Sequence, residues 1–215
     1  MKKILGLLAI VVLLVACNSK EPAPKTLCDK PCVSDTLNFT LQGNEFEPYV
    51  KLIPGNCLVD TVVWSSKVIP SKRKIHLSTI LGMIPAIDKS TVKCYIKDTS
   101  YAFLLFNDCL TRRGFWLKLS LGQTEAIEKS LSAFNTADPR YSIEEGLICY
   151  KANNTFFVQE IMTGKKASVD LPSPTLEFET MYDVVDSVNV SRGRLFLNLK
   201  DGSKTKAFEK SIELK

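Results

Sequence analysis

Alternation of apolar and polar residues is the feature that most limits what this chain can fold into. The segment Val92 to Lys97 has valine, cysteine and isoleucine at every second position, and Phe115 to Leu121 repeats the pattern. Successive side chains of a β-strand point to opposite faces, so a period of two predicts strands with one buried face. Tyr101 to Phe106 is apolar throughout, which is typical of a strand covered on both sides.

The pattern continues along the chain and predicts a mostly antiparallel β fold, as a sandwich or an open sheet. Turn residues such as Asn153-Asn154 and Arg192-Gly193 separate the strands. Further strands are expected at 36–42, 57–64, 147–151, 156–161, 166–171, 187–190, 194–199 and 205–214. The alternative is a propeller-like arrangement, because three similar hairpins have their second strands centred near Phe103, Phe157 and Phe196.

Two segments have helical spacing and predict one or two short helices. Residues 124–135 place Ile127, Leu131 and Phe134 on one helical face. Leu77 to Ile84 has a similar stripe, and the proline that follows it limits its length.

The chain begins with a short apolar segment. Lys2 and Lys3 precede 13 uncharged residues, Ile4 to Ala16. A helix of that length rises roughly 20 Å, against a hydrocarbon core of about 30 Å. The positive start, the length and the small closing residues are typical of a signal peptide.

The stretch Leu14-Val15-Ala16-Cys17 resembles the lipobox of bacterial lipoproteins. In that family a diacylglycerol is attached to the cysteine thiol, and cleavage makes this residue the first of the mature protein. The resemblance implies a signal peptide over 1–16 and lipidation of Cys17, whose acyl chains would hold the protein on a membrane. The alternatives are a signal peptide with a chance cysteine and an uncleaved anchor. Asn18 differs from the aspartate that favours inner-membrane retention in enterobacterial lipoproteins, so the outer membrane is expected, on its periplasmic or its surface face.

The residues after Cys17 suggest how the rest of the chain is divided. Residues 18–26 are polar and contain two prolines, so we expect 17–27 to be a lipidated tether. Removal of 1–16 leaves 199 residues, enough for one good core or two small ones. We expect 28–215 to form a single mainly-β domain.

Six cysteines remain after Cys17, and an even number in an exported chain suggests disulfide bonds. Six cysteines allow 15 pairings, which the sequence does not distinguish. The spacing of Cys28 and Cys32 suggests a local staple, and Cys94 and Cys109 flank a strand pair that they could bridge. The candidates are Cys28, Cys32, Cys57, Cys94, Cys109 and Cys149. A single histidine and the absence of paired C-x2-C spacings argue against a metal site.

The charge balance is mild. Without residues 1–16 the chain has 26 basic and 23 acidic residues, a net charge of +3, which gives no indication of nucleic-acid binding. The densest basic cluster, Lys72-Arg73-Lys74, is expected to be a solvated turn. The alternative is contact with anionic lipid headgroups or lipopolysaccharide.

No motif indicates a catalytic site or a cofactor. His76 is the only histidine, and the adjacent positive charges disfavour the protonated imidazole that a general base becomes, so a structural role is expected. Glu144 and Glu145, with Glu177 and Glu179, could supply the carboxylate pair of a glycosidase, but acids at strand ends are usually solvated. The sequence favours a non-enzymatic protein without settling the question.

Two further features suggest surface contacts. Trp116 falls on the opposite strand face from Phe115 and Leu117. If that face meets solvent, Trp116 and Tyr95 would form a contact patch. If a second layer covers it, they would belong to the core, and the core position is favoured. Thr36, Thr61 and Ser187 follow aspartate and precede aliphatic residues, an arrangement that resembles the O-glycosylation sequon of Bacteroidota. The Lys20-Glu21 pair after the lipobox loosely resembles the surface-export signal of the same phylum.

Together these features predict a lipid-anchored, non-enzymatic protein of the cell envelope. It would bind an envelope protein or a glycan, with the membrane as its second partner and no nucleic acid. The alternatives are a carboxylate-dependent hydrolase and a structural subunit of a secretion or surface-assembly complex.

Overall fold

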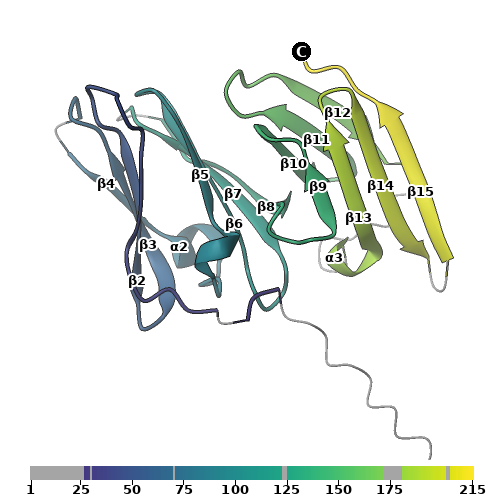
Figure 1. Cartoon of the computed structure of the whole chain (residues 1–215), viewed down its shortest axis with the longest axis horizontal. Helices are drawn as coiled ribbons and strands as arrows, with labels where there is room; N and C mark the ends of the chain where they lie inside the picture. The colour runs from purple at the N-terminus through teal and green to yellow at the C-terminus, as the bar shows by residue number, and fades with distance from the viewer. Residues whose placement is uncertain (1–26, 30, 70, 123–124, 172–180, 202–203) are drawn as a thin grey trace, which may run out of the picture.

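The computed structural model describes residues 27–215 apart from 30, 70, 123–124, 172–180 and 202–203 (Figure 1). Three sheets make up most of it, so the predicted mostly antiparallel β fold with two short helices is confirmed. The propeller-like alternative does not apply, because the three hairpins belong to two sheets rather than to separate blades. The segments predicted to be a signal peptide and most of a tether lie outside the described residues.

The first sheet is antiparallel and follows chain order. Its strands are β1 (Leu37–Thr40), β2 (Tyr49–Gly55), β3 (Leu58–Ser65) and β4 (Arg73–His76). Helix α2 (Leu77–Leu81) follows directly and ends at Gly82, whose φ of 74° is left-handed and therefore suits glycine. The short helix predicted in this region is confirmed.

The second sheet has seven antiparallel strands in the order β12-β11-β10-β8-β7-β6-β5. The 3-10 turn η1 (Lys89–Thr91) leads into it. The strands are β5 (Lys93–Lys97), β6 (Tyr101–Asn107), β7 (Gly114–Ser120), β8 (Glu128–Phe134), β10 (Leu147–Ala152), β11 (Thr155–Glu160) and β12 (Lys166–Asp170).

The third sheet has the order β15-β14-β13-β9, in which β9 is parallel to β13 and the other pairs are antiparallel. Helix α3 (Met181–Val184) leads into it. The strands are β9 (Tyr141–Ile143), β13 (Val185–Ser191), β14 (Arg194–Asp201) and β15 (Lys204–Ser211).

Both four-stranded sheets pack against the same face of the seven-stranded sheet. Leu104 and Leu117, opposite each other on β6 and β7, belong to the core cluster under the first sheet. Phe134 and Cys149, paired on β8 and β10, lie on this same face and belong to the cluster under the third sheet. The result is two sandwiches side by side that share one continuous sheet (Figure 1).

The opposite face of the shared sheet is buried because the sheet curls on itself as a half barrel. The hydroxyl of Tyr101 on β6 donates to the carbonyl of Ile161 at 2.8 Å, although three strands separate β6 from β11 in the sheet. Neighbouring strands are about 4.8 Å apart, so a flat sheet could not make this contact. The curl buries an inner cluster of Phe103, Leu105, Trp116, Ala133, Ile148, Tyr150 and Ile161.

A β-bulge between β7 and β8 lies where the two sandwiches meet. A Cβ atom on Gly114 would come within 2.2 Å of the Ala133 carbonyl oxygen, so only glycine fits. The Tyr182 hydroxyl from α3 accepts a hydrogen bond from the Gly114 N–H at 3.1 Å and donates to the Ala133 carbonyl at 2.8 Å. Burial raises the pKa of Tyr182, so the hydroxyl keeps its proton and can donate.

The helix predicted over residues 124–135 is wrong, because β8 occupies most of this segment. The bulge inserts its extra residue on β8 and shifts the alternation. Leu131 and Phe134 therefore face the same side although they are three residues apart. This spacing is the one expected of a helix, so the bulge explains the misassignment.

Candidate functional site

A hollow that opens at a sheet edge lies between β1 and β5. We call it the edge groove. It has a volume of about 520 Å³ and is lined by Asn38, Phe39, Thr40, Leu41, Cys94, Tyr95, Ile96 and Met162. β1 ends the first sheet and β5 ends the shared sheet, so the groove is the open side of the first sandwich.

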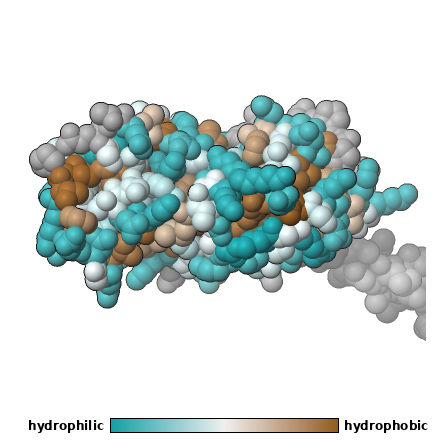
Figure 2. Space-filling view, turned by 90° about the horizontal axis from the view of Figure 1, so that it is seen from above, coloured by the Kyte–Doolittle hydropathy of each residue, from teal (hydrophilic) through white to brown (hydrophobic). Residues whose placement is uncertain are grey.

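The floor of the edge groove is the margin of the first sandwich's core. Phe39, Cys94 and Ile96 are only partly buried and pack against the core cluster. Met162 at the rim is 46 % exposed. Figure 2 shows apolar areas among the hydrophilic residues on the upper side of the molecule. Apolar side chains that remain partly exposed to solvent beside two free strand edges are typical of a docking site for a further strand.

Two other sheet edges are protected, which sets the edge groove apart. The backbone of Lys215 exchanges two hydrogen bonds with Lys166, so the chain end covers the start of β12. β15 is lined by exposed charged residues, including Lys206 and Lys210, which discourage pairing with another strand. β1 carries no charge, and the centre of β5 is Cys94-Tyr95-Ile96.

Two lysines of β5 flank the residues that line the edge groove. Lys93 and Lys97 lie on the same face of β5 and form no ion pair with any described residue. The ammonium of Lys97 lies 5.3 Å from the centre of the Tyr101 ring. Between the two lysines, the Tyr95 hydroxyl donates to Glu145 at 3.1 Å, and burial together with this carboxylate raises the pKa of Tyr95 to about 12.

A second hollow adjoins the edge groove on the outer face of the β1–β2 hairpin. Its volume is about 600 Å³, and it is lined by Asn38, Thr40, Leu41, Gln42, Gly43, Asn44, Glu45, Glu47, Tyr49 and Lys51. The Lys51 ammonium lies 5.2 Å from the centre of the Tyr49 ring. β1 therefore has a hollow on its outer face and another along its edge, and Asn38, Thr40 and Leu41 contribute to both.

Two disulfide bonds join cysteines that are distant in sequence. Cys28 bonds Cys109 over 81 residues, and Cys32 bonds Cys57 over 25. The predicted Cys28–Cys32 staple and the Cys94–Cys109 bridge are therefore wrong. Cys109 lies in the β6–β7 turn, away from Cys94 on β5.

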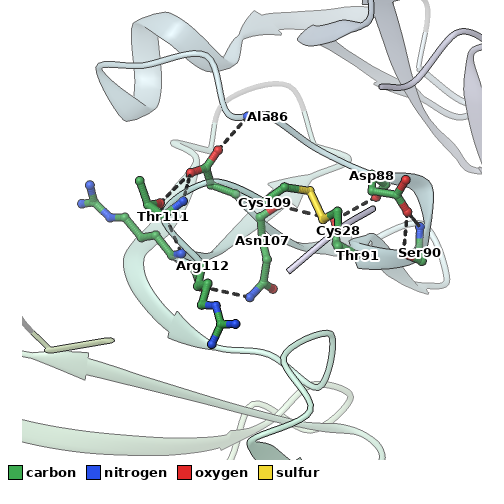
Figure 3. The surroundings of a disulfide bond; sticks show 11 residues. Cys28, Ala86, Asp88, Ser90, Thr91, Asn107, Cys109, Thr111 and Arg112 are labelled. Carbon is green, nitrogen blue, oxygen red and sulfur yellow. Dashed lines mark hydrogen bonds between the residues drawn. A yellow bond between two sulfur atoms is a disulfide. The ribbon is translucent and has the colours of Figure 1, made fainter. Parts of the chain in front are cut away.

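The Cys28–Cys109 bond lies in a hydrogen-bonded network of turns (Figure 3). The buried Asp108 carboxylate accepts the Ala86 N–H at 2.8 Å and the Thr111 N–H at 2.8 Å. The Cys109 N–H donates to the Ala86 carbonyl at 2.7 Å. This network fixes the point where the described chain enters the fold.

Cys94 and Cys149 remain as thiols among the described cysteines. Burial raises the pKa of the Cys94 thiol to about 12 and raises that of Cys149 as well. Cys149 lies on the core side of β10 and is fully buried, whereas Cys94 lines the edge groove and is partly exposed.

Trp116 is 4 % exposed, so the contact patch proposed for it and Tyr95 does not form, and the expectation that favoured a core position is confirmed. The curl of the shared sheet brings the Tyr150 ring to 5.2 Å from the Trp116 ring. Of the pair, Tyr95 alone reaches a surface hollow.

His76 and the basic cluster take structural positions. His76 Nδ1 lies 3.1 Å from the Asp60 carboxylate and 3.5 Å from the Thr61 hydroxyl, so both groups share one ring nitrogen. A Ser/Thr-His-Asp triad needs the nucleophile and the acid on opposite nitrogens, so this arrangement is not one. The solvated turn expected for 72–74 is wrong, because Arg73 and Lys74 belong to β4. Arg73 also donates to the carbonyls of Ser120, Gly122 and Glu125.

The described acids considered for a glycosidase have different partners. Glu144 pairs with Arg192, and Glu145 accepts from Tyr95. The cavity beside them holds about 20 Å³, room for about one water molecule. Glu177 and Glu179 lie outside the described residues.

The three residues predicted for O-glycosylation differ in exposure. Thr36 is exposed, and Thr61 and Ser187 are partly exposed. Within the described ranges, no group of three or more histidine, cysteine or acidic side chains is arranged to hold a metal ion. No helix in the described part of the chain is both long and apolar enough to cross a bilayer.

Comparison of the chain with protein-family models, with curated proteins and with solved structures finds no match. The functional argument therefore depends on the geometry of the edge groove. The sequence predicted the alternation of β5 and offered Tyr95 as a surface residue only in the disfavoured alternative. It missed Phe39, Ile96 and Met162 as surface residues. The signal for them is strand order, which a sequence pattern does not contain.

Proposed function

We propose that this chain is a lipid-anchored, non-enzymatic protein of the bacterial cell envelope that binds a partner through the edge groove. The observation that carries the proposal is the open side of the first sandwich, where two free strand edges flank partly exposed core residues. Such a groove offers backbone hydrogen bonds and apolar contacts but no reactive group suited to catalysis.

The proposed anchor is the lipidated Cys17, on the grounds of the lipobox resemblance. Replacing Cys17 by alanine should abolish incorporation of an alkyne-labelled fatty acid and block signal cleavage, because the thiol is the attachment point. Labelling of intact cells followed by gel analysis measures both effects. A Cys17→Ala chain that still takes up the label would refute the anchor.

The proposed binding site is tested by photo-crosslinking in intact membranes of the cells that make the protein. A photoreactive residue at Thr40, at the edge groove, should give one discrete adduct. The same residue at Thr205, an exposed threonine on the charged β15 edge, should give none. Identical adducts at both positions, or none at Thr40, would contradict a groove-specific partner. A stoichiometric protein adduct would favour the structural-subunit alternative over a freely exchanging ligand.

A further inference from the structure

The edge of β5 determines which strand could bind. β5 pairs with β6 on one side only. Apart from the hairpin-turn bond in which the Ser100 N–H donates to the Lys97 carbonyl, the backbone of its five residues makes no other backbone hydrogen bond within the described part of the chain. Its outer N–H and C=O groups are therefore available to a further strand. Cys94 and Ile96 face the core, whereas Lys93, Tyr95 and Lys97 face the other way.

A second copy of the chain fits this edge poorly. In an antiparallel β5–β5 pair that uses all five residues, Lys93 of each copy lies opposite Lys97 of the other. Like charges directly opposite each other destabilise a strand pair. The same two lysines lack acidic partners among the described residues, so an incoming strand with acids at these positions would satisfy both.

The groove also determines which residues an incoming strand should carry between its two acidic residues. Side chains of an added strand alternate with the pleat, so the positions beside Cys94 and Ile96 point toward the core. There they meet Phe39 from β1 across a hollow of about 520 Å³. Those two positions should be apolar, and the central one, beside Tyr95, is unrestricted.

We propose that the edge groove binds an extended strand of a partner protein with the pattern acid–apolar–any–apolar–acid, paired with the edge of β5. This inference rests on the proposed function and specifies the partner's chemistry. The two acids pair with Lys93 and Lys97, and the two apolar side chains complete the open side of the first core.

The test measures binding of fluorescent peptides to the full chain in detergent micelles by anisotropy. The probes have cores of Glu-Val-Thr-Val-Glu, of Lys-Val-Thr-Val-Lys, and of Glu-Thr-Val-Thr-Glu, in which the apolar positions are moved to the other face. The first should bind, and the other two should bind at least about tenfold more weakly, because cross-strand pairing and burial are lost.

Matched variants locate the site. The Lys93→Glu, Lys97→Glu double variant should reverse the preference between the acidic and basic peptides. The Lys206→Glu, Lys210→Glu variant changes two lysines at the same spacing on the β15 edge and should leave the preference unchanged. Circular dichroism confirms that both variants fold.

Alkylation of Cys94 gives a second measurement. The bound peptide should slow its reaction with N-ethylmaleimide, while the fully buried Cys149 stays unreactive throughout. If no peptide binds or protects Cys94, the strand inference is overturned, while the crosslink at Thr40 still decides the proposed function separately. If acidic and basic peptides bind equally, the groove binds strands but the acidic pattern is wrong. Protection that rises with protein concentration alone would identify a second copy as the occupant and overturn the inference.

Discussion

Removing the Cys28–Cys109 bond should lower the free energy of unfolding by about 4.5 kcal/mol. The bond closes a loop across 81 residues, and in the chain-entropy model a longer loop constrains the unfolded chain more strongly. The double change Cys28→Ala, Cys109→Ala avoids leaving a free thiol at either position. Urea unfolding of the oxidised protein and the variant, compared at their extrapolated free energies in water, measures the difference.

The second bond provides the matched control. Cys32 and Cys57 are separated by 25 residues, so Cys32→Ala, Cys57→Ala should cost about 3.5 kcal/mol. The predicted difference in unfolding free energy between the two variants therefore depends on loop length alone. A Cys28→Ala, Cys109→Ala chain as stable as the oxidised protein, or a reversed order of the two variants, would contradict the assigned pairing or its effect.

Trp116→Ala should destabilise the protein by about 3–5 kcal/mol, as is usual for removal of a buried aromatic side chain. Trp116 lies in the inner cluster of the curled sheet, where its ring contacts both Phe103 and Tyr150. The change leaves a cavity at the centre of the curl, which the surrounding strands cannot close. Thermal and urea unfolding followed by circular dichroism measure the loss.

A more conservative change separates packing from polarity. The indole N–H of Trp116 has no hydrogen-bond partner in the described structure, so Trp116→Phe retains most of the packing without losing a bond. It should cost less than about 1.5 kcal/mol. Unchanged stability in Trp116→Ala, with loss of binding to a partner, would instead restore the surface-patch hypothesis.

The sequence predicted the strands with regular alternation, because their pattern is local. Val92 to Lys97 and Arg194 to Leu199 lie close to the observed β5 and β14. β4 and β9, of four and three residues, were missed. β2 was missed as well, and it ends in Pro54-Gly55, residues more typical of turns.

The candidate site was less predictable, because it depends on neighbours that are distant in sequence. The sequence offered Tyr95 as a surface aromatic only as an alternative to a core position. The proximity of Tyr95 to Phe39 follows from the stacking of the first sheet on the shared one. The sequence could not determine the disulfide pairing for the same reason, because the bonded cysteines meet only in the folded chain. Trp116 is buried by the curl, which no local pattern encodes.

The Cys28–Cys109 bond also determines how the molecule would bear a mechanical load. Tension applied at the N-terminal end enters at Cys28 and passes through the covalent bond directly to the β6–β7 turn of the shared sheet. Residues 29–108 form a closed loop outside this force path. The first sheet and both walls of the edge groove would therefore stay relaxed while the chain is pulled from its N-terminal end.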